Sequence, residues 1–539
     1  MAKPLGSSVR QRALSERGHG LTARALTLLQ QAARHLDQHN LEAAEQTLAA
    51  VSALAPNHPE VLRLQGIALQ RRGRSGEALA VFQRALDGWP EDALIVSGIA
   101  SVLAKTGDLA GALDAFRRAC ALLPTHAANW FNLGTLLHDQ GYVGEAQAAL
   151  QRAVEIAPDH VRARIALAGV LTALGQVEDA ATQYRHAIAL DSRAMRAWLG
   201  LADMKTVRFS VEEIALLERI TNDPRIAIED RIDGEFALGK ACEDEGRYDE
   251  ALRVFSRANA AQRRRIPWNA AAFSRHVDAI MAAATEPVSG DATRGREVIF
   301  VVSLPRAGST LTEQILAAHP EVEGASELPD LTSVIEEESN VRGEPFPHWI
   351  AKATADDWRR LGHRYLQRTA RWRTSRPRMT DKMPDNWLFI VAIRAMLPGA
   401  RIVNCRRDPV ETCWSCFKQL FGPGRQLFAY DFEELGAYWR DYDRSMRFWC
   451  ARDPQRIRDQ IYEDLLADPE REIRALLDFC DLPFDPLCLN FHQSERSIRT
   501  ASAAQVREPL RRDTARSACY RELLDPLRRA LVANAVRAG

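Results

Sequence analysis

A 34-residue period in the first two hundred residues constrains the fold of this 539-residue chain more than any other feature. Glycine, proline, an aromatic residue or leucine, and two columns of alanine each return at this spacing. The columns are Gly73, Gly107, Gly141 and Gly175; Pro56, Pro90, Pro124 and Pro158; Phe82, Phe116, Leu150 and Tyr184; Ala44, Ala78, Ala112, Ala146 and Ala180; and Ala85, Ala119, Ala153 and Ala187. Several columns at one period predict a stack of similar helical units.

Each column has a packing role within such a unit. Glycine ends the first helix, and alanine lies where two helices cross without room for a larger side chain. The large apolar residue fills the groove between neighbouring units, and proline ends the second helix. The pattern resembles the tetratricopeptide repeat over about residues 24–208, with His39 in the first unit where later units carry glycine.

A further match to the repeat lies at about residues 232–265, after an interval at 209–231 that breaks the period and indicates an inserted helix and turn. We therefore expect a disordered N-terminus at 1–23, a repeat domain at 24–265 and a polar linker at 266–296. Stacked repeats present a concave face, which predicts a groove for a peptide or protein partner, or for self-association. The alternative is a scaffold that only orients the second domain.

The second domain begins with a motif that can bind an anion. Val298–Val302 is a continuous apolar run typical of a buried strand, and a helical pattern starts at Ser309 after a short loop. A strand, a loop of small residues and a helix N-terminus direct backbone N–H groups and the helix dipole at one anion. The loop is not a Walker A sequence because no lysine precedes Ser309. Arg306 and the hydroxyls of Ser309 and Thr310 suit an oxyanion bound without a metal, although the same residues could form an ordinary turn.

Further strand-then-helix segments follow at Arg378–Lys382, Ala400–Cys405 and Gln460–Leu465. This alternation predicts an α/β domain over residues 297–539, with a mostly parallel sheet covered by helices. Ligands of such sheets lie outside the carboxyl ends of the strands. Because Arg306, Lys382 and Arg407 all stand at such ends, we expect them to converge on one crevice.

Six motifs occur in a consistent order: PRAGST from Pro305, Glu327, DKMPDNW from Asp381, CRRDPVETCWS from Cys405, YEDLL from Tyr462 and TASAAQVREPL from Thr500. Together they resemble the sulfotransferases that use 3′-phosphoadenylyl sulfate (PAPS). The resemblance covers about residues 297–530 and is nearest to the tyrosylprotein sulfotransferase branch, in particular to bacterial-type proteins that join tetratricopeptide repeats to such a domain. It implies a P-loop-like fold and PAPS as co-substrate.

The resemblance also implies roles for single residues near the transferred group. The loop residues would hold the 5′-phosphosulfate; they are Arg306, Ala307, Gly308, Ser309 and Thr310. Glu327 would be the catalytic base, and Lys382 would lie near the sulfuryl group. Sulfuryl transfer needs in-line positioning and stabilisation of the leaving oxygen, which Arg306 and Lys382 can supply, and a carboxylate to deprotonate the acceptor. The alternatives are a helix-terminal role for Glu327 and surface pairing of Lys382 with Asp381 or Asp385.

The remaining implied roles concern the nucleotide. Arg407 and Ser415 would grip the 3′-phosphate, Tyr462 would contact the cofactor, and Ser502 opens a segment that covers it. Downstream, the family usually shows a basic residue beside a tryptophan. This chain has no tryptophan there, which leaves Arg516, or alternatively Arg512, as the basic partner. Arg407 could instead form a capping pair with Asp408, and Ser415 could be a packed helical serine.

Composition excludes some other functions. The chain has 71 basic and 71 acidic residues, so no global positive field indicates nucleic-acid binding. No apolar run is long enough for a membrane span, and no secretory signal is visible. Nine cysteines in strand or helix patterns favour reduced thiols. We therefore expect a cytoplasmic bacterial protein without a metal site.

The main hypothesis is a PAPS-dependent sulfotransferase that acts on an acceptor hydroxyl, whether of a peptide tyrosine, a carbohydrate or a lipid. The repeats would recruit a peptide or protein. The first alternative is a repeat-based interaction scaffold with an inactive nucleotide domain. The second is an ATP-dependent phosphotransferase, which the missing Walker lysine disfavours.

Overall fold

The computed structural model describes residues 16–284 and 292–533, except residues 495, 497, 499, 501, 502, 504 and 511–514. The chain forms two compact units, one of Met1–Leu171 and Glu178–Ala197 and one of Thr172–Val177 and Trp198–Gly539. We describe each unit separately.

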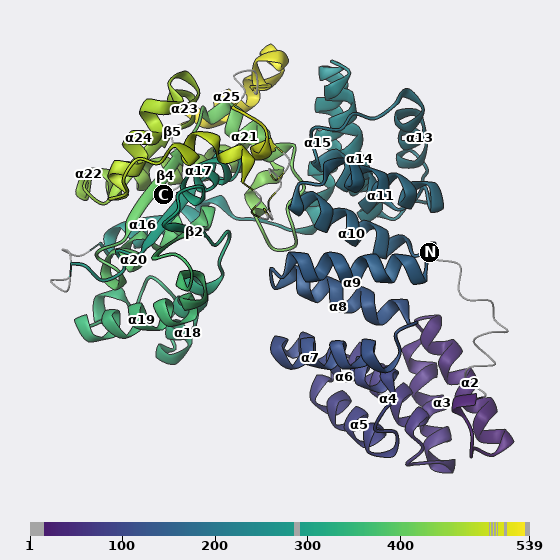
Figure 1. Ribbon diagram of the computed structural model, residues 1–539. Coiled ribbons are helices and arrows are strands. Elements are labelled where there is room, and N and C mark those ends of the chain that lie inside the picture. Colours follow the sequence, from purple (N-terminus) through teal and green to yellow (C-terminus); the bar gives the residue numbers. More distant parts are fainter. Residues whose placement is uncertain are drawn as a thin grey trace. The chain divides into compact units, whose positions relative to one another are not determined.

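The first unit consists of helices that pair in chain order (Figure 1). They are α2 (Ala23–Asp37), α3 (Leu41–Leu54), α4 (Pro59–Arg71), α5 (Ser75–Gly88), α6 (Ala93–Thr106), α7 (Leu109–Leu122), α8 (Ala127–Asp139), α9 (Val143–Ile156), α10 (Val161–Leu174) and α11 (Val177–Leu190). Both α10 and α12 (Met195–Asp203) run across the boundary between the units. The fold class is confirmed for this region, which is entirely helical within the described residues.

Residues at the ends of the first helices explain the glycine column. Gly73, Gly107 and Gly141 have φ values of 81°, 90° and 87°, in the left-handed region that glycine enters without steric cost. His39 occupies the same place in the first unit and takes a φ of 57°. The degenerate first unit therefore keeps the geometry of the later ones, with a residue less suited to it.

The N-terminal segment differs from the expectation of disorder through residue 23. Arg17 pairs with Glu60 at 2.7 Å and with Asp92 at 2.6 Å, and it lies over the Trp89 ring. These contacts order the end of the segment, whereas residues 1–15 lie outside the described part of the chain.

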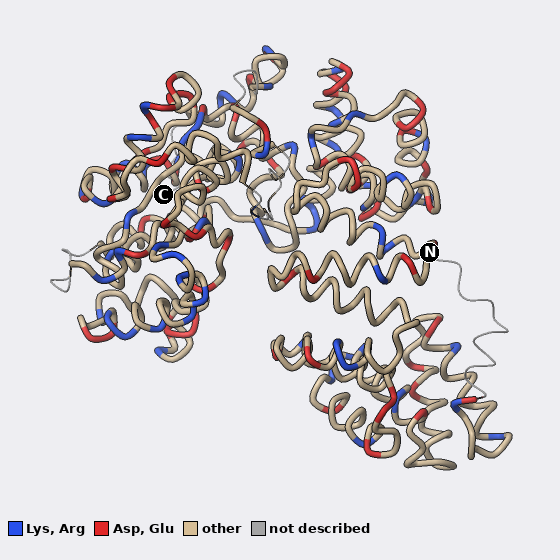
Figure 2. The backbone as a smooth tube through the Cα atoms, in the orientation of Figure 1, with Lys and Arg blue, Asp and Glu red and all other residues tan. Residues whose placement is uncertain are grey.

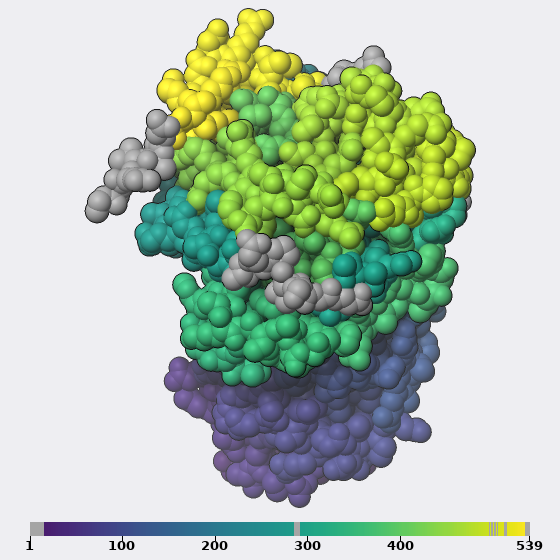
Figure 3. All heavy atoms as spheres, turned by 90° about the vertical axis from the view of Figure 1, so that its left-hand side faces the viewer, coloured from purple at the N-terminus to yellow at the C-terminus, as the bar shows by residue number. Residues whose placement is uncertain are grey.

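The second unit contains helices that precede the α/β domain. They are α13 (Val211–Thr221), α14 (Ile228–Asp244), α15 (Tyr248–Arg265) and α16 (Ala270–Ala282). Helix α13 occupies the interval that breaks the repeat period, and α14 with α15 forms the further helix pair. The expected linker at 266–296 holds α16, so part of it is not a linker. Arg444 of α22 (Phe432–Arg452) pairs with Asp278 of α16 at 2.6 Å. In the space-filling view, teal segments from the middle of the chain adjoin yellow-green segments from its later part (Figure 3).

Five parallel strands form the sheet of the α/β domain in the order β2-β3-β1-β4-β5. They are β1 (Val298–Ser303), β2 (Val322–Gly324), β3 (Arg378–Lys382), β4 (Arg401–Arg406) and β5 (Ile457–Ile461). The order places β1 at the centre, with later segments added on both sides. The expected α/β fold with a parallel sheet is confirmed.

Helices bury both faces of this sheet, which is why the central strand β1 is apolar from Val298 to Val302. On one face Ile299 and Val301 pack in a core with α17 (Ser309–Ala317) and α24 (Pro469–Phe479). On the other face Phe300 contacts Tyr365 of α19 (Ala355–Arg368), with ring centroids 5.8 Å apart.

Basic and acidic residues are interspersed along each unit without a long segment of one sign (Figure 2). Within the described residues, none of the helices combines the length and the apolar character that a bilayer crossing requires.

The packing around Phe82 allows a test of the repeat geometry. A Cβ atom at Gly66 would lie 2.7 Å from the Phe82 ring, and one at Gly98 would lie 2.6 Å from it on another helix. The ring cannot yield, so Gly66→Ala should destabilise the first unit by about 1–3 kcal/mol despite the better helix propensity of alanine. Denaturant unfolding followed by circular dichroism measures this.

Gly76→Ala is the matched control, because nothing lies within 4 Å of a Cβ atom at this helical position. It should leave stability unchanged or raise it by up to about 1 kcal/mol. Equal effects of the two substitutions would contradict the packing argument.

Candidate functional site

The carboxyl ends of all five strands lie at one edge of the sheet, and each is followed closely by a residue singled out from the sequence. In spatial order, Glu327 follows β2, Lys382 ends β3, Arg306 follows β1, Arg407 follows β4 and Tyr462 follows β5. The register places the carboxyl ends of β3, β1 and β4 at nearly the same level, since Val301 pairs with Lys382 and Ser303 with Cys405. The sheet therefore brings these five residues to one edge.

The loop after β1 has the backbone of an anion-binding turn. Arg306 has a φ of 69° and Gly308 a φ of 96°, so the chain turns tightly before α17 begins at Ser309. The side chains of Ser309 and Thr310 are buried in the first turn of that helix. The helix N-terminus supplies unpaired N–H donors and a favourable dipole for a negative charge.

Tyr462 connects the loop with Arg407. A Cβ atom at Gly308 would lie 2.9 Å from the Tyr462 ring, so only glycine permits this approach. The Arg407 guanidinium lies 4.7 Å from the centroid of the same ring. Arg407 also pairs with Glu411 of α21 (Pro409–Phe417) at 3.4 Å.

Positive charge accumulates around Arg306. Burial lowers the pKa of Arg306, and the nearby charge of Arg407 lowers it further, although Asp203 opposes the effect. An arginine stays protonated at neutral pH even so. Arg306 and Arg407 thus influence each other electrostatically, and the negative charge of Asp203 offsets part of their repulsion.

Glu327 and Lys382 form a close charged pair at the edge. Lys382 Nζ donates to Glu327 Oε1 at 2.8 Å, and the lysine side chain is only 1% exposed. Arg425 donates to the other carboxylate oxygen, Oε2, at 2.8 Å. Burial raises the pKa of Glu327, but Lys382 and then Arg425 outweigh it and hold this pKa below its usual value.

A buried polar network orients the turn that carries Glu327. Ser326 has a φ of 63°, and its backbone N–H donates to Glu313 Oε1 at 2.8 Å. Glu313 is 1% exposed, and it also accepts from the Thr380 hydroxyl at 2.9 Å and pairs with Arg496 at 3.0 Å. The network joins α17, β3 and the segment after residue 493 to the Glu327 turn.

The sequence comparison identifies this part of the chain. A model described as the sulfotransferase family matches residues 298–486. Tetratricopeptide-repeat models match residues 29–93, 63–127, 98–161 and 137–202. Residues 298–486 form a sulfotransferase-family domain. It follows an N-terminal region of tetratricopeptide repeats.

Curated relatives are distant. An uncharacterized protein of Aquifex aeolicus is 31% identical over 314 residues, which cover 56% of this chain and 41% of that protein. The protein-tyrosine sulfotransferase A of Caenorhabditis elegans is 26% identical over 211 residues, which cover 36% of this chain and 52% of that protein. The chain thus spans about half or less of the length of these two relatives.

A tetratricopeptide repeat protein from Parabacteroides merdae is a structural neighbour with 20% identity, and the match covers 44% of this chain and 93% of that one. Its TM-score of 0.32 is too low to support an inference.

The remaining expected site residues of the sulfotransferase-family domain do not directly follow a strand. Ser415 is half-buried in α21. Arg516 reaches the site through its backbone N–H, which donates to Glu411 Oε2 at 3.0 Å, while its side chain is exposed. Ser502 lies outside the described residues, as does Arg512. Two positions before Ser502 in the sequence, the Thr500 hydroxyl lies 3.2 Å from that of Thr310.

Sequence reasoning missed several residues that contact the predicted site residues or their turn, namely Glu313, Glu411, Arg425 and Arg496. Glu411 lies within the motif that begins at Cys405. Only the structure shows that it contacts Arg407 and the backbone of Arg516. Arg425 and Arg496 stand in segments without periodicity, so no local signal could have indicated them.

The motif acids beside Lys382 do not pair with it. Asp381 accepts hydrogen bonds from Tyr365 at 2.7 Å and from Asn386 at 3.2 Å. Asp385 accepts from Gln426 at 2.8 Å and from Tyr438 at 3.0 Å. The alternative of a surface pair between Lys382 and these acids is therefore wrong.

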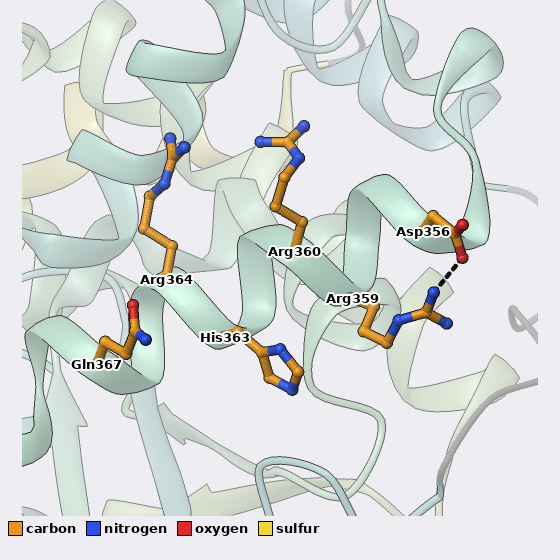
Figure 4. Close-up of a pocket in the computed structure, with 6 residues that line it drawn as sticks. All are labelled: Asp356, Arg359, Arg360, His363, Arg364 and Gln367. Atoms are coloured by element: carbon orange, nitrogen blue, oxygen red, sulfur yellow. Dashed lines mark hydrogen bonds and ion pairs between the residues drawn. The ribbon is translucent and has the colours of Figure 1, made fainter.

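A hollow of about 430 Å³ lies on the surface of α19, and none of the residues that line it is an expected site residue (Figure 4). Its arginines are already paired: Arg360 with Glu338 at 2.9 Å, Arg364 with Glu337 at 3.4 Å and Arg359 with Asp356. We do not assign it a function. Within the described residues, no cluster of three or more His, Cys, Asp or Glu side chains is arranged to hold a metal.

Asp381 gives a test of the interior of the sulfotransferase-family domain. Burial raises the pKa of Asp381 to about 7. The unfolded chain releases the same proton near pH 4, so the folded state binds more protons between about pH 4 and 7. The stabilising contribution is complete below about pH 4 and is lost as the pH rises to about 7, by up to about 4 kcal/mol.

Asp381→Asn removes the titration, because an amide is neutral throughout. The Tyr365 bond can remain, and Asn386 can turn its Oδ1, which has no hydrogen-bond partner, toward the new amide. Relative to the wild type, the variant should gain stability between pH 4 and 7, as measured by denaturant unfolding at each pH. Parallel pH profiles would disprove the assignment.

Proposed function

We propose that this protein is a PAPS-dependent sulfotransferase that moves a sulfuryl group to an acceptor hydroxyl. The observation that carries the proposal is the Glu327–Lys382 contact of 2.8 Å at the strand edge that also carries Arg306, within a sulfotransferase-family domain. A carboxylate that can take a proton thus lies beside a buried ammonium that can stabilise a leaving oxygen.

The residues fit the charges of PAPS. Arg306, the helix N-terminus at Ser309 and Thr310, and Lys382 would hold the 5′-phosphosulfate. Arg407 would bind the 3′-phosphate, since its guanidinium is held between the Tyr462 ring and Glu411. Ser415, Ser502 and Arg516 remain proposed contacts of the nucleotide, as do Ala307 and Gly308 through their backbone.

The proposed reaction forms one bond and breaks another. The acceptor oxygen attacks sulfur, and the bond between sulfur and the bridging phosphate oxygen breaks. Glu327 takes the acceptor proton, and Lys382 and Arg306 stabilise the charge that develops on the leaving phosphate. The lowered pKa of Glu327 keeps it deprotonated at neutral pH, as a base must be before the reaction.

A peptide tyrosine is the acceptor we favour among hydroxyls, because of the similarity to the C. elegans protein-tyrosine sulfotransferase A. Tetratricopeptide repeats support binding of a protein or peptide, which would bring the acceptor to the enzyme. A scaffold with an inactive nucleotide domain would bind no adenosine 3′,5′-bisphosphate, and an ATP phosphotransferase would show magnesium-dependent ATP turnover.

Substitution of the base tests the mechanism. Glu327→Gln should lower transfer from labelled PAPS to a tyrosine peptide by a factor of about 10²–10⁴, because the amide cannot accept the proton. Calorimetry should show that binding of adenosine 3′,5′-bisphosphate is retained. Glu321→Gln changes an exposed residue nearby and should keep full activity. Transfer at the wild-type rate by Glu327→Gln would remove Glu327 from this role.

Arg425 gives a separate prediction about pH. Arg425 and Lys382 both lower the pKa of Glu327. Because 58% of the Arg425 side chain is exposed, this residue can be replaced without creating a cavity in the core. In Arg425→Gln the pKa of Glu327 should rise, and the acid limb of the kcat/KM profile should move to higher pH. Arg359→Gln, which changes an exposed arginine paired with Asp356, should leave the profile in place. An unchanged acid limb in Arg425→Gln would show that Glu327 is not the group that titrates.

A further inference from the structure

Arg496 reaches the turn that carries Glu327 from a distant segment of the chain. Its Nε atom donates to the carbonyl of Gly324, the last residue of β2, at 3.0 Å. Its Nη2 atom donates to the hydroxyl of Ser326 at 2.9 Å. One guanidinium therefore bonds to the chain on both sides of Ala325 and spans the step from the strand to the turn.

Helix α17 fixes the same guanidinium in place. Its Nη1 atom donates to Gln314 Oε1 at 3.2 Å, and its Nη2 atom lies 3.0 Å from Glu313 Oε1. Gln314 is fully buried and Glu313 is 1% exposed. Because a guanidinium is planar and rigid, contacts from all three of its nitrogens leave it a single orientation. The helix thus holds Arg496, and Arg496 in turn holds the chain around Ser326.

Ser326 needs such support because its backbone is strained. Its φ of 63° lies in the left-handed region, which is unfavourable for a residue that has a Cβ atom. Its N–H donates to Glu313 Oε1 at 2.8 Å, its carbonyl accepts from the Lys382 N–H at 3.1 Å, and its hydroxyl accepts from Arg496. If Ser326 left this conformation, the next residue, Glu327, would turn with it.

Compensation of the Glu313 charge does not account for the whole arrangement. A lysine at position 496 could also place a positive charge near this buried carboxylate. Its single ammonium could not reproduce the planar fork that bonds to Gly324, Gln314 and Ser326 together. The geometry of the arginine therefore matters in addition to its charge.

We propose that Arg496 is a positioning residue for the proposed catalytic base: it holds Ser326 in its left-handed turn and thereby keeps Glu327 beside Lys382. The contact that it maintains is the 2.8 Å hydrogen bond from Lys382 Nζ to Glu327 Oε1. The inference rests on the proposed function for the role of Glu327. Loss of Arg496 should therefore slow the transfer step more than it weakens nucleotide binding.

Arg496→Lys tests this proposal, because lysine keeps a positive charge near Glu313 and loses the fork. At saturating labelled PAPS and tyrosine peptide, kcat should fall by about ten- to hundredfold, since a small displacement of a catalytic group can cost about a hundredfold. Calorimetry should show little change in the affinity for adenosine 3′,5′-bisphosphate, because the arginines proposed to bind it follow β1 and β4 and not β2.

Arg376→Lys is the matched control. Arg376 also joins α17 to β2 through one guanidinium, since its Nη1 atom donates to the carbonyls of Ala317 at 3.0 Å and of Val322 at 2.6 Å. These bonds lie at the start of β2, away from the Glu327 turn. Arg376→Lys therefore loses similar contacts but should keep the wild-type kcat. Denaturant unfolding of both variants measures their stability.

Glycine at position 326 provides a rescue. Because glycine enters the left-handed region without steric cost, the turn in Ser326→Gly should depend much less on Arg496. In that background Arg496→Lys should lower kcat only by about threefold or less, as a double-mutant cycle of coupled sites would show. If Arg496→Lys does not fold, Ser326→Ala serves instead. It removes the hydroxyl that Arg496 holds and keeps a Cβ atom, so its kcat should be lower than that of Ser326→Gly.

The outcomes separate the two proposals. A folded wild type that does not transfer label from PAPS would overturn the proposed function, and this inference with it. An active wild type whose kcat is unchanged in Arg496→Lys would overturn only the role of Arg496. The same conclusion would follow from an equal loss of kcat in Arg376→Lys, a parallel loss of nucleotide affinity, a failed rescue by glycine, or equal kcat values for Ser326→Ala and Ser326→Gly.

Discussion

The parallel direction of the five strands is the constraint on which the site depends. Parallel strands have all their carboxyl ends at one edge, so residues from remote segments of the chain meet there without any direct local preference for one another. Glu327 and Lys382 are 55 positions apart, yet β2 and β3 are neighbours and their ends bring the two side chains to 2.8 Å. The central position of β1 in turn places the Arg306 loop between Lys382 and Arg407.

Two of the cations at this edge are compensated by neighbouring groups of the protein. Lys382 is compensated by Glu327, and Arg407 by Glu411 and the Tyr462 ring. Arg306 and Lys205 lie where burial and neighbouring cations disfavour their charge. Asp203 opposes both of these shifts, so part of the cost of burying the two cations is offset within the protein.

The units of the structure do not coincide with the division that motifs suggest. Motifs separate a repeat domain at 24–265 from a sulfotransferase domain at 297–539, and that division stays a proposal. The compact second unit, by contrast, begins near Trp198 and includes α13 to α16. Asn259, Glu243 and Asp278 make its internal contacts with the α/β domain. Repeat-like helices can therefore support a domain of another fold class, since an exposed apolar face of a helix pair is stabilised by any complementary surface.

Local patterns in the sequence determine much of this protein. Periodic glycine, alanine and proline define the repeats, because each repeated residue meets the same packing demand in every unit. The strand, loop and helix around Arg306 are also local, and so are the cations at the ends of β3 and β4. Tertiary structure alone decided the rest. Arg425 contacts Glu327, and Arg496 contacts Glu313, from segments far away in the chain. Ser326 takes its left-handed turn within a buried network. Such contacts depend on which surfaces pack together, and that information is not contained in any short stretch of sequence.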